Sequence, residues 1–187
     1  MNTALLVIDM LNDLAFEGGD ALLPAAIAVA QRLTTFTAQA RAAGLPIIYV
    51  NDNYGRWHAD RDQLVDHVTR RDAPGRDVAL LMRPADDDYL VVKPRVSGFY
   101  ATTLPVLLPQ LGVTRLILAG IAVDMCVLFT AADAHMREYD LWIPADLVAG
   151  EDDQRADWAL DIMHKSMGAE TRPTGVLPLD DWVAKPA

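Results

Sequence analysis

The sequence predicts a doubly wound α/β fold, with a mostly parallel sheet of about six strands and helices on both of its faces. Short runs of Val, Ile and Leu recur between segments of helix length, without the apolar–polar alternation of a half-exposed strand. Strands that alternate with helical segments indicate parallel βαβ units, and therefore a Rossmann-like arrangement in three layers. The strand candidates are Ala4–Ile8, Pro46–Val50, Tyr89–Val92, Arg115–Ala119 and Leu141–Ile143.

The clearest helix signal is an apolar stripe that would cover the sheet. Its members follow one another at alternating steps of four and three residues, and the pattern stops at Gly44 and Pro46. The stripe consists of Leu22, Ala26, Val29, Leu33, Phe36 and Ala40. We also predict helices at Thr103–Gln110, Cys126–Glu138 and Asp152–Met167, and a short edge strand at Ala169–Arg172.

Residues 51–84 are the least regular part of the chain. They contain a charge-dense stretch and a Pro74–Gly75 turn signal, so we expect a loop and a short helix over one end of the sheet. Excursions of this length often shape a binding site. No composition shift divides the chain, so we expect residues 1–187 to form a single domain.

Composition and charge narrow the classes of partner. The chain has 187 residues, 52% of them hydrophobic, with 16 Lys and Arg against 26 Asp and Glu, so its net charge is −10. This charge disfavours nucleic acid as a partner. A single cysteine excludes an internal disulfide, the first residues lack the pattern of a secretory signal, and no uninterrupted apolar stretch reaches the ~18 residues of a membrane span. We therefore predict a cytoplasmic protein without a membrane partner.

Three reactive side chains follow predicted strands. Asp9 comes directly after the first apolar run, Lys93 after the third, and Cys126 in a turn after the fourth. Ligands of open parallel sheets bind outside the carboxyl ends of the strands, where these side chains would meet. A thiolate is an effective nucleophile, Asp9 can accept its proton and return it to a leaving nitrogen, and Lys93 stabilises both anions. This chemistry requires no cofactor and acts on a small-molecule substrate.

The surroundings of Cys126 allow two interpretations. The apolar periodicity that follows places it in the first turn of a helix, with Asp124 as a candidate N-cap, and the free N–H groups there favour a thiolate or an oxyanion. Taken alone, however, a single cysteine is more often a small buried hydrophobe, Asp9 can cap a turn and Lys93 can be a surface charge. The joint placement of the three after separate strands is what favours catalysis.

Three sequence blocks resemble the isochorismatase-like cysteine hydrolases, a family that includes nicotinamidases, N-carbamoylsarcosine amidase, ureidoacrylate and maleamate amidohydrolases and isochorismatases. The blocks are ALLVIDMLNDL at 4–14, VVKPRVSGFYATTL at 91–104 and LILAGIAVDMCVLFTAADAHMREYDLWIPADLVAG at 116–150. The resemblance implies Asp9, Lys93 and Cys126 as the catalytic residues. It also implies a cis peptide bond between Ile121 and Ala122, an oxyanion hole made by the N–H groups of Ala122 and Cys126, and a homodimer or homotetramer.

The departures from the family pattern concern the substrate and the metal. Val123 replaces a common Thr, and Val96-Ser97-Gly98-Phe99 replaces Tyr-Ser-Ala-Phe. Nicotinamidases of the family carry a metal site with an Asp-x-His pair, which Asp52-Asn53-Tyr54 lacks. His58 and His67 lie nearby without a ligand partner at the usual spacing, so we predict no metal.

The remaining predictions concern the pocket and the reaction. Our candidates for substrate contact are Asn51, Asp52, Trp57, Phe99 and Tyr100, although ordinary loop packing explains each of them equally well. The predicted reaction is cleavage of a C–N bond in a small amide, ureido or carbamoyl compound through a thioester. One alternative is vinyl-ether hydrolysis of the isochorismatase type, which generally does not need the thiol. Another is a non-catalytic binding or thiol-redox protein, against which the retention of all three residues argues.

Overall fold

The computed structural model describes residues 3–56 and 60–184 and contains a six-stranded sheet of parallel pairs. The strands are β1 (Thr3–Ile8), β2 (Ile47–Asp52), β3 (Tyr89–Lys93), β4 (Arg115–Ile121), β5 (Asp140–Trp142) and β6 (Val148–Ala149). Five of them follow the order β3-β2-β1-β4-β5, and β6 pairs with β4. The predicted doubly wound sheet is therefore confirmed, and the five strand candidates are shifted by only one or two residues.

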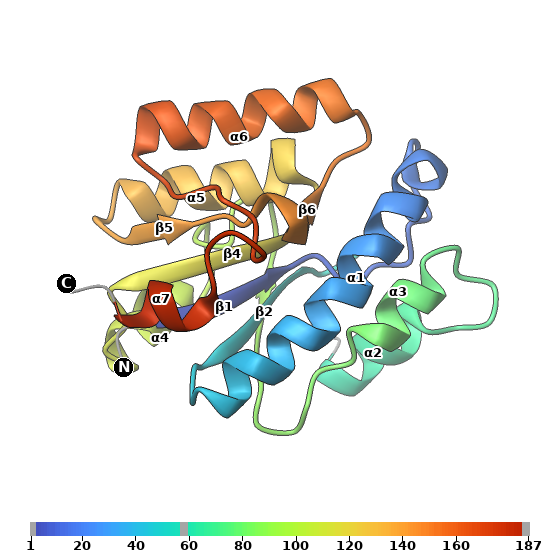
Figure 1. Cartoon of the computed structure of the whole chain (residues 1–187). Helices are drawn as coiled ribbons and strands as arrows, with labels where there is room; N and C mark the ends of the chain where they lie inside the picture. Colours follow the sequence, from blue (N-terminus) through green and yellow to red (C-terminus); the bar gives the residue numbers. More distant parts are fainter. Residues whose placement is uncertain (1–2, 57–59, 185–187) are drawn as a thin grey trace.

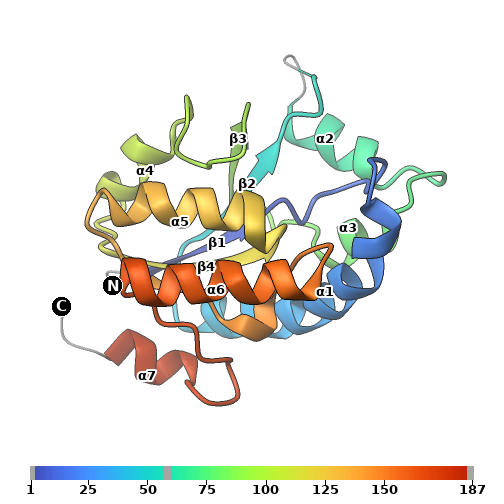
Figure 2. The same cartoon turned by 90° about the horizontal axis from the view of Figure 1, so that it is seen from above.

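Helices cover both faces of the sheet (Figures 1 and 2). One face carries α1 (Gly19–Ala42), α2 (Arg61–Val68), α3 (Arg76–Leu81) and α7 (Leu179–Ala184), and the other carries α4 (Leu104–Gln110), α5 (Leu128–His135) and α6 (Asp153–Met167). Successive side chains of a strand point to opposite faces, so Leu5 and Val7 of β1 join the first core while Leu6 and Ile8 join the second. The result is the predicted arrangement in three layers.

Helix α1 confirms the apolar stripe, since all six of its predicted members are buried. It ends before Gly44, whose φ of 74° provides the left-handed turn that the sequence indicated. The helix has 24 residues and is long and apolar enough to cross a membrane by length and composition, which corrects our expectation that no segment would be. A helix that covers the sheet of a globular domain meets the same criterion, and this one packs on the sheet.

Some elements differ from the prediction. The irregular segment after β2 contains two helices, α2 and α3, and α2 begins at a capping box made by Asp60 and Gln63. Ala169–Arg172 contributes a single bridge, in which Glu170 pairs with Trp142 next to β5. The closing helix α7, which we did not predict, buries Leu179 and Trp182 against the α1 face. Its six residues are too few to show a helical period.

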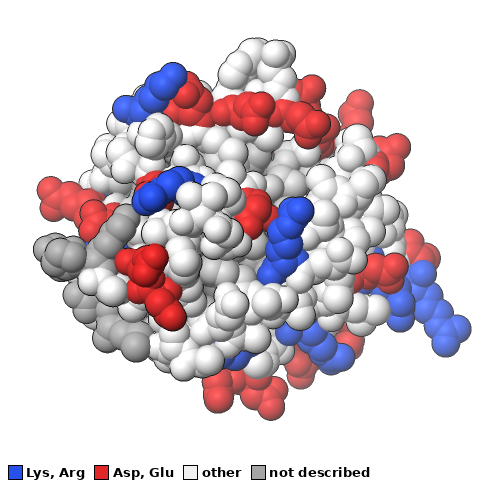
Figure 3. All heavy atoms as spheres, viewed as in Figure 1, with Lys and Arg blue, Asp and Glu red and all other residues white. Residues whose placement is uncertain are grey.

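The surface carries its acidic charge partly in rows. Acidic side chains lie across the top of the molecule over α6 (Figure 3), where Asp153, Asp157 and Asp161 recur every four residues. Four-residue spacing places them on one face of the helix. This side of the molecule therefore presents carboxylates where a nucleic-acid-binding protein would present a basic stripe.

Candidate active site

The order of the strands determines where a ligand can bind. The chain builds the sheet from β1 through β2 to β3, then returns to place β4 on the other side of β1. Ligands of doubly wound folds bind at the carboxyl ends of the strands where this reversal occurs. In this protein that point lies between the ends of β1 and β4, next to Asp9 and the segment that carries Cys126.

Asp9 is the first residue after β1 and has a left-handed backbone conformation, with φ at 51°. Asp tolerates this region better than most residues. Its N–H donates to the carbonyl of Val50 over 3.0 Å, and its Oδ1 accepts from the N–H of Asp52 at 2.8 Å. Two contacts with the neighbouring strand β2 therefore hold the carboxylate in place.

Lys93 ends β3 and is buried, with only 1% of its side chain exposed. Its Nζ lies 2.8 Å from Asp9 Oδ2 and 3.4 Å from Cys126 Sγ. A buried ammonium requires a counter-ion, and Asp9 is that counter-ion. The structure thus brings together the carboxylate, ammonium and thiol whose meeting the sequence predicted.

Cys126 lies in a π-helical turn, η1 (Val123–Val127), that connects β4 to α5. The N–H of Val127 donates to the carbonyl of Ala122 over 3.2 Å, which gives the five-residue spacing of a π-helix. Such turns occur frequently at functional sites. Sequence periodicity correctly placed Cys126 in the first turn of a helical segment but could not distinguish a π-turn from an α-turn.

Asp124 does not cap this segment, which corrects our sequence-based expectation. The N-cap position belongs to Ala122, and no side chain hydrogen-bonds there. Asp124 instead forms an ion pair with Arg155 of α6, with Oδ2 and Nη2 2.6 Å apart. Its carboxylate therefore ties η1 to the helix outside it.

Gly120 allows β4 to approach β1 closely just before this turn. It pairs with Ile8 in the parallel register and has φ at 123°. A Cβ atom at this position would lie 2.0 Å from the carbonyl oxygen of Ile8, so only glycine fits without a backbone shift. The strand ends that carry Asp9 and precede Cys126 are thereby held in contact.

The mutual electrostatics keep the thiol protonated in the resting protein. Burial and the negative charge of Asp9 raise the pKa of Cys126 to about 12, against the opposing effect of Lys93. Burial also raises the pKa of Asp9, while Lys93 and the hydrogen bond with Cys126 oppose this shift. Burial alone would lower the pKa of Lys93, but Asp9 and Cys126 outweigh it and the net shift is upward. The resting site therefore holds a thiol beside an ammonium–carboxylate pair.

A cavity of about 390 Å³ opens onto this trio. Its volume suits a small organic molecule. Ile121 and Ala122, joined by a cis peptide bond, line the cavity together with Cys126. The N–H groups of Ala122 and Cys126 therefore belong to residues at the cavity wall, and their role as an oxyanion hole stays a prediction.

The five substrate-contact candidates fall in different places. Asp52 lines the cavity, whereas Asn51 is fully buried behind it and exchanges hydrogen bonds with the backbone of Leu11. Phe99 and Tyr100 lie outside the lining: Phe99 is buried under Arg137, and Tyr100 is 61% exposed. The structure thus places these two aromatic side chains elsewhere than the sequence predicted. Trp57 and His58 lie outside the described residues.

Sequence reasoning missed most of the remaining cavity wall. The sequence fits Phe16 equally well as pocket wall or as oligomer contact, and the structure places it in the lining of the cavity. The other described residues of the lining are Asn12, Leu22, Tyr54, Pro94, Arg95, Val96, Met125 and Glu151. Val96 carried a sequence signal as a departure from the family pattern, and Leu22 as the first member of the apolar stripe, which indicated a covered sheet and not a cavity. The others stand on loops or in the turn η1, where no periodic pattern points to them.

The described residues contain no group of three His, Cys, Asp or Glu side chains that could hold a metal ion. His67 lies 3.2 Å from Asp13 through its Nε2, and Arg70 contacts the same carboxylate at 3.0 Å. Tyr54 donates its hydroxyl to the carbonyl of Leu11 over 2.6 Å. The contacts of Asp13 hold the loop after β1 against the end of α2, and the Tyr54 contact holds the same loop against the turn after β2.

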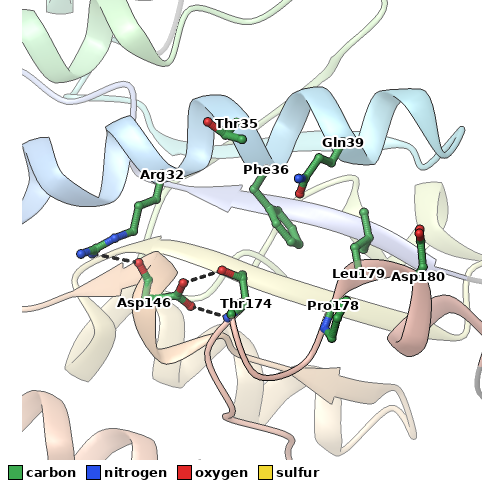
Figure 4. Close-up of a pocket in the computed structure, with 10 residues that line it drawn as sticks. Arg32, Thr35, Phe36, Gln39, Asp146, Thr174, Pro178, Leu179 and Asp180 are labelled. Atoms are coloured by element: carbon green, nitrogen blue, oxygen red, sulfur yellow. Dashed lines mark hydrogen bonds between the residues drawn. The ribbon is translucent and has the colours of Figure 1, made fainter.

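A larger cavity, of about 630 Å³, lies between α1 and the segment that leads into α7 (Figure 4). Several of its polar groups hydrogen-bond with one another: Asp146 accepts from the N–H and the hydroxyl of Thr174, at 2.9 and 2.5 Å. Arg32 donates to the carbonyl of Asp146 at 3.4 Å. None of the reactive trio lines this cavity, so we place the chemistry in the smaller one in spite of the difference in volume.

Comparisons with known proteins agree with this site. Residues 3–174 match the isochorismatase domain family. An uncharacterized isochorismatase family protein, YaaI of Bacillus subtilis, is 39% identical over 167 residues, which cover 89% of this chain and 91% of that protein. The ureidoacrylate amidohydrolase RutB of Methylorubrum extorquens is 30% identical over 164 residues, 73% of this chain and 65% of that protein.

A solved structure extends the comparison to three dimensions. The N-carbamoylsarcosine amidase of Thermoplasma acidophilum is 31% identical and superposes with a TM-score of 0.71, covering 93% of this chain and 97% of that one. The family match spans nearly the whole described chain and includes all three residues that meet at the cavity. The chain therefore belongs to the isochorismatase family and is a hydrolase of that family.

Proposed function

We propose that the protein hydrolyses a carbon–nitrogen bond of a small amide, ureido or carbamoyl compound through a thioester on Cys126. The observation that carries this proposal is the contact of the buried Lys93 Nζ with both Asp9 Oδ2 and Cys126 Sγ, at 2.8 and 3.4 Å. A binding protein does not require a thiol beside a buried ammonium and carboxylate, and vinyl-ether hydrolysis does not require the thiol. The relatives named as amidohydrolase and amidase support the same reaction class.

The first half of the reaction forms the acyl-enzyme. Cys126 Sγ attacks the carbonyl carbon while its proton passes to Asp9, and the new C–S bond gives a tetrahedral oxyanion. The N–H groups of Ala122 and Cys126 are the donors we propose for this oxyanion. The C–N bond then breaks, and the departing nitrogen takes the proton from Asp9 so that it leaves as ammonia or an amine.

The second half restores the enzyme. Water enters the cavity and attacks the thioester carbonyl as Asp9 accepts a proton from it. The C–S bond breaks, the carboxylic acid is released, and the sulfur recovers its proton. Lys93 keeps its positive charge throughout and stabilises whichever of the two neighbouring groups is negative, the carboxylate or the thiolate.

The raised pKa of the thiol is compatible with this mechanism. A thiol with a pKa of about 12 is not ionised at rest, so the thiolate forms only as its proton moves to Asp9 during attack. The site thereby protects its single cysteine from unselective oxidation or alkylation, which require a free thiolate. This property argues against a thiol-redox function.

The proposal is tested with a panel of small amides, ureido acids and carbamoyl compounds. Release of ammonia or amine from at least one compound is expected, and quenching during turnover should give a protein whose mass is increased by that of the acyl group. Digestion should place the adduct on Cys126. An adduct on another residue, or an undiminished release of product by the Cys126→Ser variant, would contradict the thioester route.

The pH dependence of the reaction follows from Asp9. Asp9 must be ionised to accept the proton, and burial raises its pKa above the ordinary 3.8. At pH values below the pKa of Asp9, which lies above 3.8, kcat/KM should therefore fall about tenfold per pH unit. Since Lys93 has its pKa raised above 10.5, it produces no alkaline limb below that pH. A rate profile, with circular dichroism to show that the protein stays folded, checks this. A rate that increases towards acid pH would contradict the assignment of Asp9 as the base.

A further inference from the structure

Five charged side chains line the catalytic cavity, and two of them neutralise each other. Asp9 and Lys93 form the buried pair described above. The other three are Asp52, Glu151 and Arg95. The catalytic mechanism uses none of these three, so each of them requires a separate explanation.

The two carboxylates have structural explanations. Asp52 Oδ1 accepts a hydrogen bond from the N–H of Tyr54 at 2.7 Å, which shapes the turn after β2. Glu151 packs against Gly18, the N-cap of α1: a Cβ at Gly18 would lie 2.3 Å from Glu151 Oε2. The N-terminus of a 24-residue helix carries a partial positive charge, which stabilises a carboxylate there.

Arg95 has no such explanation. It is exposed and forms no hydrogen bond or ion pair with any residue that the structure describes. It shares the cavity with three carboxylates but is within ion-pair distance of none of them. In the described part of the chain, it is therefore the one cation of this cavity without a partner.

The backbone of Arg95 is nevertheless fixed on both sides. It follows Lys93 by two residues, and Pro94 between them has a restricted φ. On the other side, Ser97 donates its hydroxyl to Asp133 Oδ2 at 2.5 Å, and the N–H of Gly98 donates to Thr130 Oγ1 at 2.9 Å. Both partners lie on α5, directly after the turn that carries Cys126. A guanidinium on a fixed base loses less freedom when it binds a ligand.

We propose that Arg95 binds a carboxylate of the substrate, so that the enzyme acts on small amides that also carry a carboxylate. This inference rests on the proposed function and specifies its substrate class. A guanidinium binds a carboxylate through two parallel hydrogen bonds, and a cavity open on one side leaves it accessible to the ligand. Two residues span at most about 7 Å, so Arg95 and Lys93 can act on one small molecule at the same time.

Matched pairs of compounds test the proposal, because the members of a pair differ in charge but hardly in shape. Succinamate and succinamide form one pair, and N-carbamoylglycine and N-carbamoylglycinamide form the other. In the Cys126→Ala variant, which is expected not to turn substrate over, calorimetry should show that at least one acid binds ten-fold or more tighter than its amide. Adding Arg95→Gln should remove that preference and leave the binding of the amide within about two-fold.

The control is Arg83→Gln, which removes the same charge from an arginine outside the cavity lining and should leave both affinities unchanged. In the otherwise unaltered enzyme, Arg95→Gln should raise KM for the acid with little change in kcat, because a group remote from the reacting bond contributes uniform binding. Equal binding of acid and amide, no binding of either acid, or an acid preference that survives Arg95→Gln overturns the proposal. These outcomes are independent of the thioester adduct, whose absence would instead contradict the proposed reaction.

Discussion

Replacing Cys126 with alanine should reduce kcat on the best amide substrate by on the order of 10⁴-fold or more, because the attacking atom is lost. Serine at this position should also be nearly inactive, since a hydroxyl ionises less readily than a thiol and the site already opposes ionisation of the sulfur. The measurement is the initial rate of amine release, with thermal unfolding to show that each variant is folded.

If the alanine variant still turned substrate over, the reaction would not depend on the thiol. Vinyl-ether hydrolysis of the isochorismatase type is the alternative to test in that case. If no compound of any class is turned over by the natural enzyme, the non-catalytic binding hypothesis gains support. The two results lead to different functions, so the experiment is informative in either direction.

Replacing Lys93 with methionine should both abolish turnover and destabilise the fold. The side chain of Asp9 is only 7% exposed and would lose its counter-ion, which costs about 3 kcal/mol or more when a buried pair is broken from one side. Its pKa would rise further, since Lys93 now lowers it. A carboxylate whose folded pKa exceeds its unfolded value favours folding at low pH, and this contribution is lost as the pH rises through the folded pKa. The loss of stability should therefore be larger at pH 8 than at pH 5.

Urea unfolding of Lys93→Met at these two pH values measures the effect. Lys165→Met is the matched control, because it removes an ammonium whose side chain is 71% exposed and whose partner Asp161 is also at the surface. Such a pair contributes little to stability. A Lys93 variant that is as stable as this control at pH 8 would show that Asp9 does not depend on the ammonium.

The catalytic trio was predictable because one rule of parallel sheets covers it. Asp9 follows one apolar strand and Lys93 ends another, and the carboxyl ends of parallel strands meet at one edge of the sheet. Their separation in sequence is irrelevant to this rule. The apolar stripe of α1 was predictable for a similar reason, since a helix that covers a sheet must repeat its buried face.

The cavity wall was not predictable, because it consists of loop positions that obey no period. Phe16 and Glu151 are 135 positions apart in the sequence, yet both line the cavity, and Gly18 at the start of α1 leaves room for the glutamate. Phe99 illustrates the opposite error. Its position close to Lys93 in sequence suggested a pocket role, yet the loop turns it away to pack with Tyr139 and Arg137. Proximity in sequence does not fix direction when the intervening residues form a turn.

The close approach of Gly120 to the carbonyl oxygen of Ile8 affects which substitutions can change the activity of this enzyme. The separation of base and nucleophile is set by two backbones in register and not by the shape of core side chains. Substitutions that repack the core should therefore lower the melting temperature before they change the reactivity of the thiol. The loops that line the cavity do not take part in this backbone contact. Substitutions in them can therefore change the substrate preference while the reaction itself stays the same.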